Sequence, residues 1–178
     1  KIRLIRSVER LAAATAHRVL TAEHPKRDLL IEHGIPADKV SVLLNLPDHR
    51  LFPPHFQLAD PGLTSRSSDD PEQPFRLIYH GTLAPRLGLD RAILALRQLR
   101  ERIPGVTLDL IGDGDHRPEL ERLVREHDLG DRVRFSRGFR PIEEVIPTIR
   151  AAHLAVIPTR PDVSTDYMLP TKLLEYLA

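Results

Sequence analysis

The sequence predicts an α/β fold in which helices cover both faces of a Rossmann-like parallel sheet. From about residue 74 to the C-terminus, short apolar runs alternate with amphipathic helical segments. The connections between them are short, and several contain glycine. Such alternation is typical of a parallel sheet with helices packed on both sides. A strand-helix-strand segment within residues 1–47 precedes this domain.

The composition excludes several function classes. The chain has 178 residues, of which 41% are hydrophobic and 4% aromatic, so a core must be built mainly from Leu, Ile, Val and Ala. A formal net charge of +1 provides no overall field that would attract nucleic acid. The absence of cysteine excludes disulfides, thiolate metal sites and thiol nucleophiles. Because the sequence shows neither a secretion signal nor an apolar run of about 20 residues, we expect a cytoplasmic protein.

Residues 1–47 are expected to form a helix followed by a strand, a helix and a strand. Helical spacing puts Ile5, Val8 and Leu11 on one side of a helix over residues 2–16, with arginines on another face. A basic face can lie on a membrane surface, but it is more often simply solvated. The remaining elements are expected as strands at 18–21 and 40–43, with a helix from about Pro25 to Gly34 between them.

Residues 48–73 have the composition of a linker or long loop. Turn formers dominate this stretch, as in Asp60-Pro61-Gly62, so a domain boundary is expected here. The following domain, residues 74–178, ends within a helical pattern, which we interpret as truncation. Its strands are expected at 75–79, 106–111, 133–135 and 154–157, and its helices at 89–103, 117–127, 141–151 and from about Pro170.

Four loops are candidate binding sites, because ligands of open parallel sheets bind at the carboxyl ends of the strands. The first loop contains Gly81, which lets the backbone approach a ligand closely, and Thr82. Arg86 could add a bidentate contact to phosphate. A tight turn with an exposed arginine would explain the same residues.

The second loop contains Gly112 and Gly114 and resembles the start of a dinucleotide-binding fingerprint. Arg117 stands where a third glycine would be needed, so a simple turn before a helix is favoured. In the third loop, Arg137 and Arg140 could meet an anion or stack on a base. Nucleic-acid binding is not expected, since it needs a broader basic surface and more aromatic residues.

The fourth loop enters a helix near Pro170, whose first amides could bind an anion. Lys172 and Glu175 lie three residues apart, which fits an anion site or simply an ion pair. No metal site is expected, because no histidines have the spacing of zinc ligands. The sequence contains neither a Gly-x-Ser-x-Gly nucleophile motif nor a Gly-Lys-Ser/Thr phosphate loop.

Taken in order, these loops resemble the donor domain of retaining glycosyltransferases of family 4, which share the two-domain GT-B fold. Each motif is weak alone, and the order and spacing of the motifs carry the resemblance. The matching stretches are 40–45, 79–83 with 88–90, 110–114, 133–138 and 170–178. The resemblance implies that residues 1–47 are the C-terminal end of an acceptor-binding domain. Residues 74–178 would then be an incomplete domain that binds the nucleotide-sugar donor.

The resemblance also implies roles for the loop residues. Glu175 would accept hydrogen bonds from the donor ribose, and the Gly138 loop would hold the base through its backbone. Arg86 and Lys172 are the candidate catalytic residues, which would stabilise the charge on the departing diphosphate. The residues expected to bind the donor are Gly81, Thr82, Gly112, Gly114, Arg137, Gly138, Phe139, Thr171, Leu174 and Glu175.

The sequence departs from the family pattern at two places. Thr82 and Leu87 stand where the family commonly has arginine and lysine, so Arg86 would have to supply the positive charge. Tyr167 stands where a glutamate often contacts the sugar. The exact phosphate contacts and the sugar are therefore left open.

The activity implied by the resemblance is transfer of a sugar, with retention, from a nucleoside-diphosphate sugar to a glycan or lipid-linked acceptor. No metal or other cofactor would be needed. The acceptor would bind through the missing domain, peripheral contact with the inner membrane face stays open, and the chain alone is expected to be inactive. The alternatives are a Rossmann-type oxidoreductase, a non-catalytic nucleotide-binding module, and a phosphorylase or epimerase of related fold.

Overall fold

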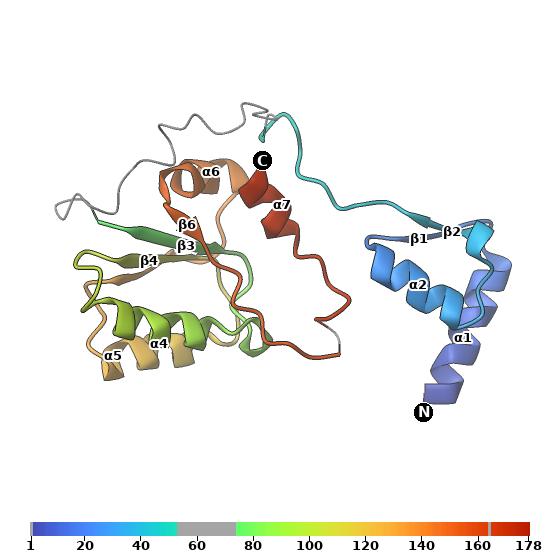
Figure 1. The fold of residues 1–178 in the computed structure, drawn as a ribbon, viewed down its shortest axis with the longest axis horizontal. Coiled ribbons are helices and arrows are strands. Elements are labelled where there is room, and N and C mark those ends of the chain that lie inside the picture. Colours follow the sequence, from blue (N-terminus) through green and yellow to red (C-terminus); the bar gives the residue numbers. More distant parts are fainter. Residues whose placement is uncertain (1, 53–73, 164) are drawn as a thin grey trace. The chain divides into compact units, whose positions relative to one another are not determined.

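The computed structural model describes residues 2–52, 74–163 and 165–178, which divide into two compact units (Figure 1). The first unit comprises residues 1–47 and 161–174, and the second comprises residues 48–160 and 175–178. Most of the predicted linker, residues 53–73, lies outside the described residues. The elements are α1 (Ile2–Thr15), β1 (Val19–Thr21), α2 (His24–Glu32), η1 (Ala37–Lys39), β2 (Val40–Val42), β3 (Arg76–His80), η2 (Pro85–Leu87), α4 (Leu89–Leu99), β4 (Thr107–Ile111), α5 (Arg117–Glu126), β5 (Val133–Phe135), α6 (Ile142–Ala151), β6 (Leu154–Ala155) and α7 (Thr171–Leu177).

The first unit contains the predicted strand-helix-strand. Strands β1 and β2 pair in parallel, with Val19 opposite Val40, and α2 connects them. Pro25 lies in the first turn of α2, where its missing N–H needs no partner. The turn that ends the helix includes Gly34, whose φ of +91° favours glycine and whose N–H donates to the Ile31 carbonyl at 2.8 Å.

Helix α1 is amphipathic as predicted, but its apolar side is not a core surface. The side chains of Ile5, Val8 and Leu11 are 66%, 59% and 67% exposed. The buried core cluster of this unit consists of Ala13, Ile35 and Val40. Within the described part of the chain, no helix combines the length and the apolar character needed to cross a membrane.

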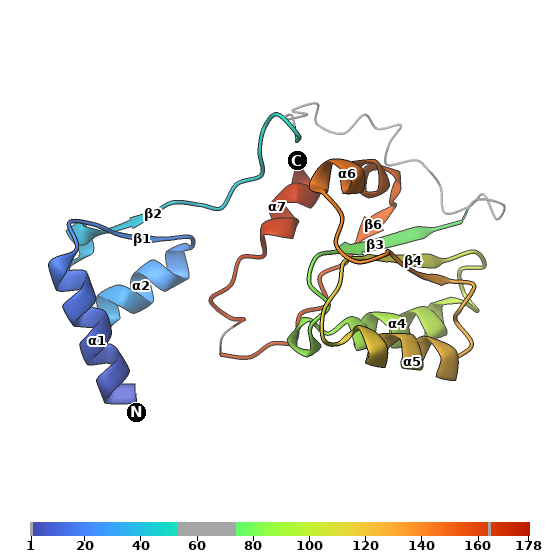
Figure 2. The ribbon, with the colours of Figure 1, turned by 180° about the vertical axis from the view of Figure 1, so that it is seen from behind.

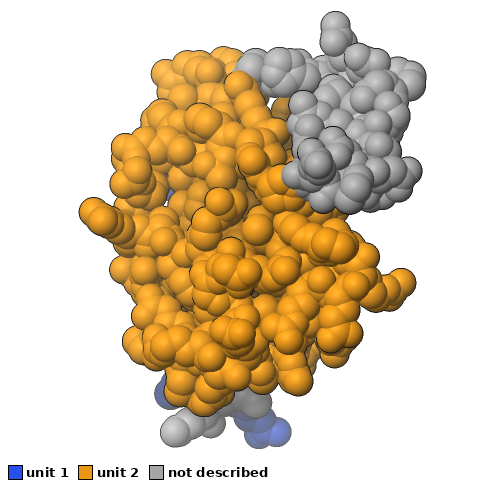
Figure 3. Space-filling view, turned by 90° about the vertical axis from the view of Figure 1, so that its left-hand side faces the viewer, with its two compact units in different colours: residues 1–47, 161–174 blue, residues 48–160, 175–178 orange. Residues whose placement is uncertain are grey.

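The second unit, orange in Figure 3, contains a four-stranded sheet in the order β5-β4-β3-β6. The strands are parallel, and Leu77 of β3 lies between Leu108 of β4 and Leu154 of β6. Helices α4 and α5 cover one face of the sheet and α6 covers the other (Figure 1 and Figure 2). The predicted parallel sheet with helices on both faces is therefore confirmed.

The main core of the second unit lies between the sheet and helices α4 and α5. Leu108 and Leu110 are alternate residues of β4 and point to one face of the sheet, where both are fully buried. Ile93 and Leu96 of α4 are three residues apart and are likewise 0% exposed. The strand and helix periods in the sequence therefore place these side chains in one core cluster.

Two elements are shorter than predicted. Helix α4 ends at Leu99 instead of near residue 103. Residues 100–102 form turns, and Pro104 disfavours helical conformation at the residue before it, Ile103. Ile103 nevertheless packs against the core. Strand β6 is followed by one more bond to β3, from the Val156 N–H to the Ile78 carbonyl at 2.9 Å. Pro158 has no N–H and cannot continue the ladder.

Candidate functional site

The carboxyl ends of the strands in the second unit form the candidate site. From β3 the chain proceeds to β4 and β5 on one side, and β6 lies on the other side of β3. In open α/β sheets, ligands bind at the point where the strand order reverses in this way. The loops that leave β3, β4 and β5 span residues 81–88, 112–116 and 136–141.

The loops after β3 and β4 are bonded to each other beyond the ends of the strands. The Gly81 N–H donates to the Ile111 carbonyl and the Leu83 N–H to the Asp113 carbonyl, both at 2.8 Å. A Cβ atom at Gly112 would lie 1.9 Å from the Gly81 oxygen, and one at Gly114 would lie 2.3 Å from the Leu83 oxygen. These two glycines are therefore required for close contact between the loops, whatever they contribute to a ligand.

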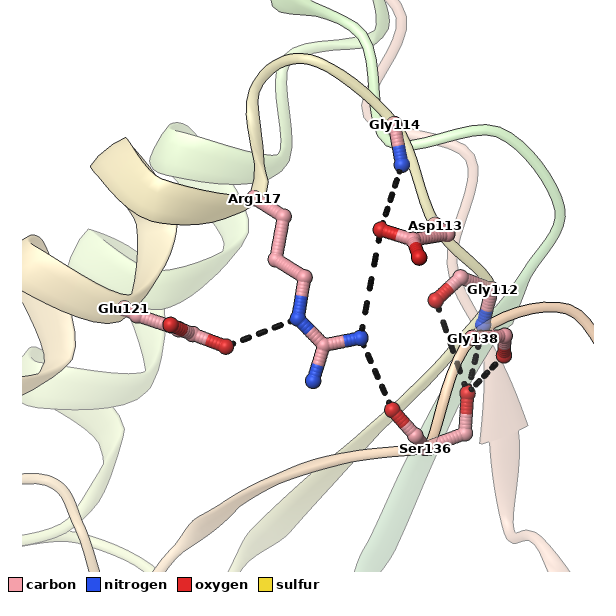
Figure 4. A network of polar contacts seen from close by, with 7 residues as sticks. All are labelled: Gly112, Asp113, Gly114, Arg117, Glu121, Ser136 and Gly138. Carbon is pink, nitrogen blue, oxygen red and sulfur yellow. Dashed lines mark hydrogen bonds and ion pairs between the residues drawn. The ribbon is translucent and has the colours of Figure 1, made fainter.

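Ser136 joins the third loop to the second (Figure 4). Its Oγ accepts a hydrogen bond from the Gly112 N–H at 2.9 Å and donates one to the Gly138 carbonyl at 2.7 Å. Gly138 has a φ of +69°, in the left-handed region that favours glycine. On either side of it, Arg137 is exposed and the Phe139 side chain is 64% exposed.

Glu175 is held by the last residue of β3. The His80 Nε2 lies 3.0 Å from Glu175 Oε2, and the His80 N–H donates to Tyr176 Oη at 3.1 Å. The rings of His80 and Tyr176 meet edge to face, with their centroids 5.1 Å apart. Burial raises the pKa of Tyr176 to about 12, although the hydrogen bond from His80 acts against this shift. The Glu175 carboxylate is thereby fixed beside the strand that leads into the first glycine loop.

Arg86 lies in the short helix η2 with an exposed side chain. Its carbonyl accepts a hydrogen bond from the Arg160 N–H at 3.2 Å. A Cβ atom at Gly88 would lie 2.1 Å from the Pro158 oxygen, and Arg160 forms an ion pair with Asp90. The backbone around Arg86 is therefore fixed against the chain that follows β6.

The structure brings some of the predicted residues into one group of contacts within the second unit. Gly81, Gly112, Gly114, Gly138 and Glu175 belong to one hydrogen-bonded arrangement in the second unit, through the contacts of His80 and Ser136. Thr82 is exposed, and its carbonyl accepts a hydrogen bond from the Tyr79 hydroxyl at 2.7 Å. Thr171, Lys172 and Leu174 lie on α7 and group with the first unit. The ligand-binding roles of all the predicted site residues stay predictions.

Several residues of the site were not singled out from the sequence, or were given no role in it. They are His80, Ser136, Arg160, Tyr176 and Arg117, which stood only as a departure from a glycine fingerprint. The partners of His80, Arg160 and Tyr176 lie 70 to 96 residues away in the chain, so no local spacing could have indicated those contacts. Among the described residues, no group of three or more His, Asp or Glu side chains could hold a metal ion.

Comparisons with known proteins agree with this architecture. The family model described as "Glycosyl transferases group 1" matches residues 74–178. The chain is 29% identical over 150 residues to the amylovoran biosynthesis glycosyltransferase AmsK of Erwinia amylovora, covering 84% of this chain and 34% of that protein. It is 29% identical over 153 residues to the alpha-D-kanosaminyltransferase of Streptomyces kanamyceticus, covering 85% of this chain and 39% of that protein. The chain thus spans little more than a third of these relatives.

Solved structures show the same likeness. The crystal structure of Anabaena HepE in complex with UDP and glucose superposes with a TM-score of 0.61 and 26% identity. The match covers 84% of this chain and 40% of the HepE chain. The apo form of the lipopolysaccharide outer core galactosyltransferase WaaB matches with a TM-score of 0.59 and 20% identity, covering 90% of this chain and 40% of that chain, and supports the fold alone.

Proposed function

The chain belongs to the group 1 family of glycosyl transferases, and from this we propose that residues 74–178 bind the donor, a nucleoside-diphosphate sugar. Because the chain spans only part of the length of its relatives, we also propose, as the reaction of the whole enzyme, transfer of the sugar to an acceptor. The HepE complexes with UDP and with UDP-glucose support this class of donor.

The contact between His80 and Glu175 is the observation that most favours this function. A carboxylate that binds the two hydroxyl groups of a ribose must be ionised and held in one orientation. His80 can hold the Glu175 carboxylate in one orientation, since its Nε2 lies 3.0 Å from Oε2 and its side chain is only 10% exposed. Glu175 is thereby placed at the strand end where α/β sheets bind nucleotides.

We propose that Arg86 and Lys172 stabilise the negative charge that develops on the departing diphosphate. Preorganised donors of this kind each contribute about 3 to 4 kcal/mol to a transition state. Two cations would make a divalent metal unnecessary, and we propose a retaining, metal-independent transfer. Thr82 stands where relatives commonly carry an arginine, so Arg86 would replace that charge from a neighbouring position.

The acceptor would bind outside the donor site, on the part of the enzyme that this chain contains only in part. We therefore expect no sugar transfer by the 178-residue chain alone, even where it binds donor. Incubation with UDP-glucose and a panel of sugar acceptors, followed by mass spectrometry of the products, tests this. Formation of a glycosylated product would show that the chain holds a complete active site.

Donor binding is tested by thermal shift of the chain with UDP, GDP, ADP and NAD. A ligand at 100 times its dissociation constant stabilises the folded state by about 2.7 kcal/mol. For a chain of this size, that corresponds to a shift of roughly 5 to 11 °C. We expect one nucleoside diphosphate to give such a shift and NAD to give none. Stabilisation by NAD alone would favour an oxidoreductase and contradict the proposal.

The role of Glu175 is tested with Glu175→Gln, which keeps the size of the side chain and removes its charge. The shift produced by the nucleoside diphosphate should fall to less than about half, since hydrogen bonds to a charged group contribute about 1.5 to 3 kcal/mol. Glu143→Gln is the matched control, because Glu143 is an exposed residue in the first turn of α6. Equal ligand shifts in the two variants would remove Glu175 from the site.

A further inference from the structure

Arg117, at the start of α5, connects two loops of the candidate donor site (Figure 4). Its Nη1 donates to the Ser136 carbonyl at 2.8 Å, and its Nε donates to Glu121 Oε1 at 2.7 Å. The same Nη1 lies 4.0 Å from Asp113 Oδ1, and the guanidinium lies 5.4 Å from the centre of the Phe135 ring. The Arg117 side chain is 23% exposed. These contacts hold the guanidinium in one orientation, between the loop after β4 and the loop after β5.

The Ser136 carbonyl is the point that Arg117 fixes. This oxygen also accepts the Gly138 N–H at 3.1 Å, while the Ser136 hydroxyl donates to the Gly138 carbonyl. Both main-chain groups of Gly138 are thus used within the loop. The main chain of Arg137 and Phe139 is then the part of this loop that would meet a nucleobase.

Building on the proposed function, we propose that Arg117 is a positioning residue for the nucleobase of the donor. It holds Ser136, and through Ser136 the left-handed turn at Gly138, in the binding conformation before the donor arrives. A loop that is already ordered loses less conformational entropy when a ligand binds. Because the diphosphate is expected at Arg86 and Lys172, loss of Arg117 should affect recognition of the base and spare the phosphates.

A purely structural role for Arg117 makes a different prediction. The pair with Glu121 is an i,i+4 ion pair on α5, and contact with Phe135 can stabilise the fold through a cation–π interaction. If these contacts were its only contribution, loss of Arg117 would lower stability and leave the ratio of nucleotide affinity to pyrophosphate affinity unchanged. That ratio therefore separates the two roles.

The test is calorimetric titration of the 178-residue chain with UDP, GDP and pyrophosphate. Arg117→Gln should lower the affinity for the nucleoside diphosphate about tenfold, the effect expected for one charge-assisted hydrogen bond. The affinity for pyrophosphate should be unchanged. Arg122→Gln is the control on the same helix, since Arg122 pairs with Glu119 and Glu126 and should affect neither ligand. An unchanged nucleotide affinity in Arg117→Gln, or an equal loss for pyrophosphate, would overturn the proposal.

Amide hydrogen exchange tests the positioning without any ligand. In Arg117→Gln, the Gly138 amide, which donates to the Ser136 carbonyl, should exchange about tenfold faster, while the Leu108 and Leu110 amides of β4 keep their rates. If this variant does not fold, Ser136→Ala removes the hydroxyl link to Gly112 and Gly138 and should have the same effect. Unchanged exchange in the loop would refute the positioning role. Failure of the unaltered chain to bind any nucleotide would instead refute the proposed function.

Discussion

The two units bury their apolar side chains to very different extents. Helix α4 of the second unit places Leu89, Ile93 and Leu96 in a core where each is 0% exposed. Helix α1 of the first unit has a comparable apolar stripe, yet Leu4 and Leu11 are 70% and 67% exposed. The amphipathic pattern produced a helix in both cases. It produced a core only where a four-stranded sheet provides a surface to pack against, since two strands provide too little.

This difference predicts where the stability of the chain resides. The second unit should unfold as one cooperative body, because a single cluster links strands β3, β4 and β5 with helices α4 and α5. The first unit, with a buried cluster of Ala13, Ile35 and Val40, should contribute much less. Substitutions in each unit therefore test this difference in stability.

The largest effect is expected from Gly112→Ala. The added methyl would lie 1.9 Å from the Gly81 oxygen, at a φ of +148° that other residues rarely adopt. Gly81 cannot move away without losing its bond to Ile111. We expect a loss of about 4 kcal/mol or more. Exchange mass spectrometry should show loss of protection in β3 and β4, while peptides from α2 are unchanged.

Gly130→Ala is the control for this substitution. No atom lies within 4 Å of a Cβ built at Gly130, and its φ is not positive. The change should stay within about 1 kcal/mol and can even stabilise the chain by restricting the unfolded state. Full protection of β3 and β4 in Gly112→Ala would show that the two loops are less closely coupled than their geometry indicates.

A smaller effect is expected from emptying a core position. Leu108→Ala should cost about 3 kcal/mol, because the side chain is fully buried and leaves a cavity. The matched change in the first unit, Leu11→Ala, should cost less than about 0.5 kcal/mol, because Leu11 is mostly exposed. Urea denaturation followed by circular dichroism measures both. Equal costs would mean that α1 contributes as much to the folded state as the sheet does.

The smallest expected effect is the loss of folding stability at high pH. Burial raises the pKa of Tyr176 from 10.0 to about 12. Between these values the unfolded chain has released a proton that the folded second unit retains, so the stability present below pH 10 falls as pH rises. The expected fall is on the order of 2 kcal/mol. Urea titrations at pH 8, 10 and 12 should show a shallower fall for Tyr176→Phe, and a parallel fall in both proteins would contradict this.

The spacing of apolar residues in the sequence predicted the helices and strands well, because local patterns largely determine them. Alternating Leu108 and Leu110 indicated a strand with one buried face, and the structure confirms it. Proline and glycine marked most boundaries, as Pro25 and Gly34 do for α2. The errors were in length and concern β6 and the end of α4, where the local pattern continues but the hydrogen-bonded element does not.

The contacts of the candidate site were less accessible to prediction. Glu175 was identified through a family resemblance, and its partner His80 lies 95 positions earlier, where nothing in the local sequence indicates a pairing. Gly112 and Gly114 suggested contact with a ligand, whereas the structure shows that their own neighbouring loop requires them. Arg117 breaks a nucleotide-binding fingerprint, and only its three-dimensional surroundings give it a function.

The contact between the glycine loops has a consequence for redesign of the proposed donor site. Gly112 and Gly114 approach the backbone of the neighbouring loop with no room for a side chain, so libraries that vary these two glycines would mostly yield unfolded proteins. Thr82, on the loop after β3, and Arg137 and Phe139, on the loop after β5, are exposed and can change without disturbing that contact. Directed evolution toward a new sugar nucleotide should begin with combinations at these three positions.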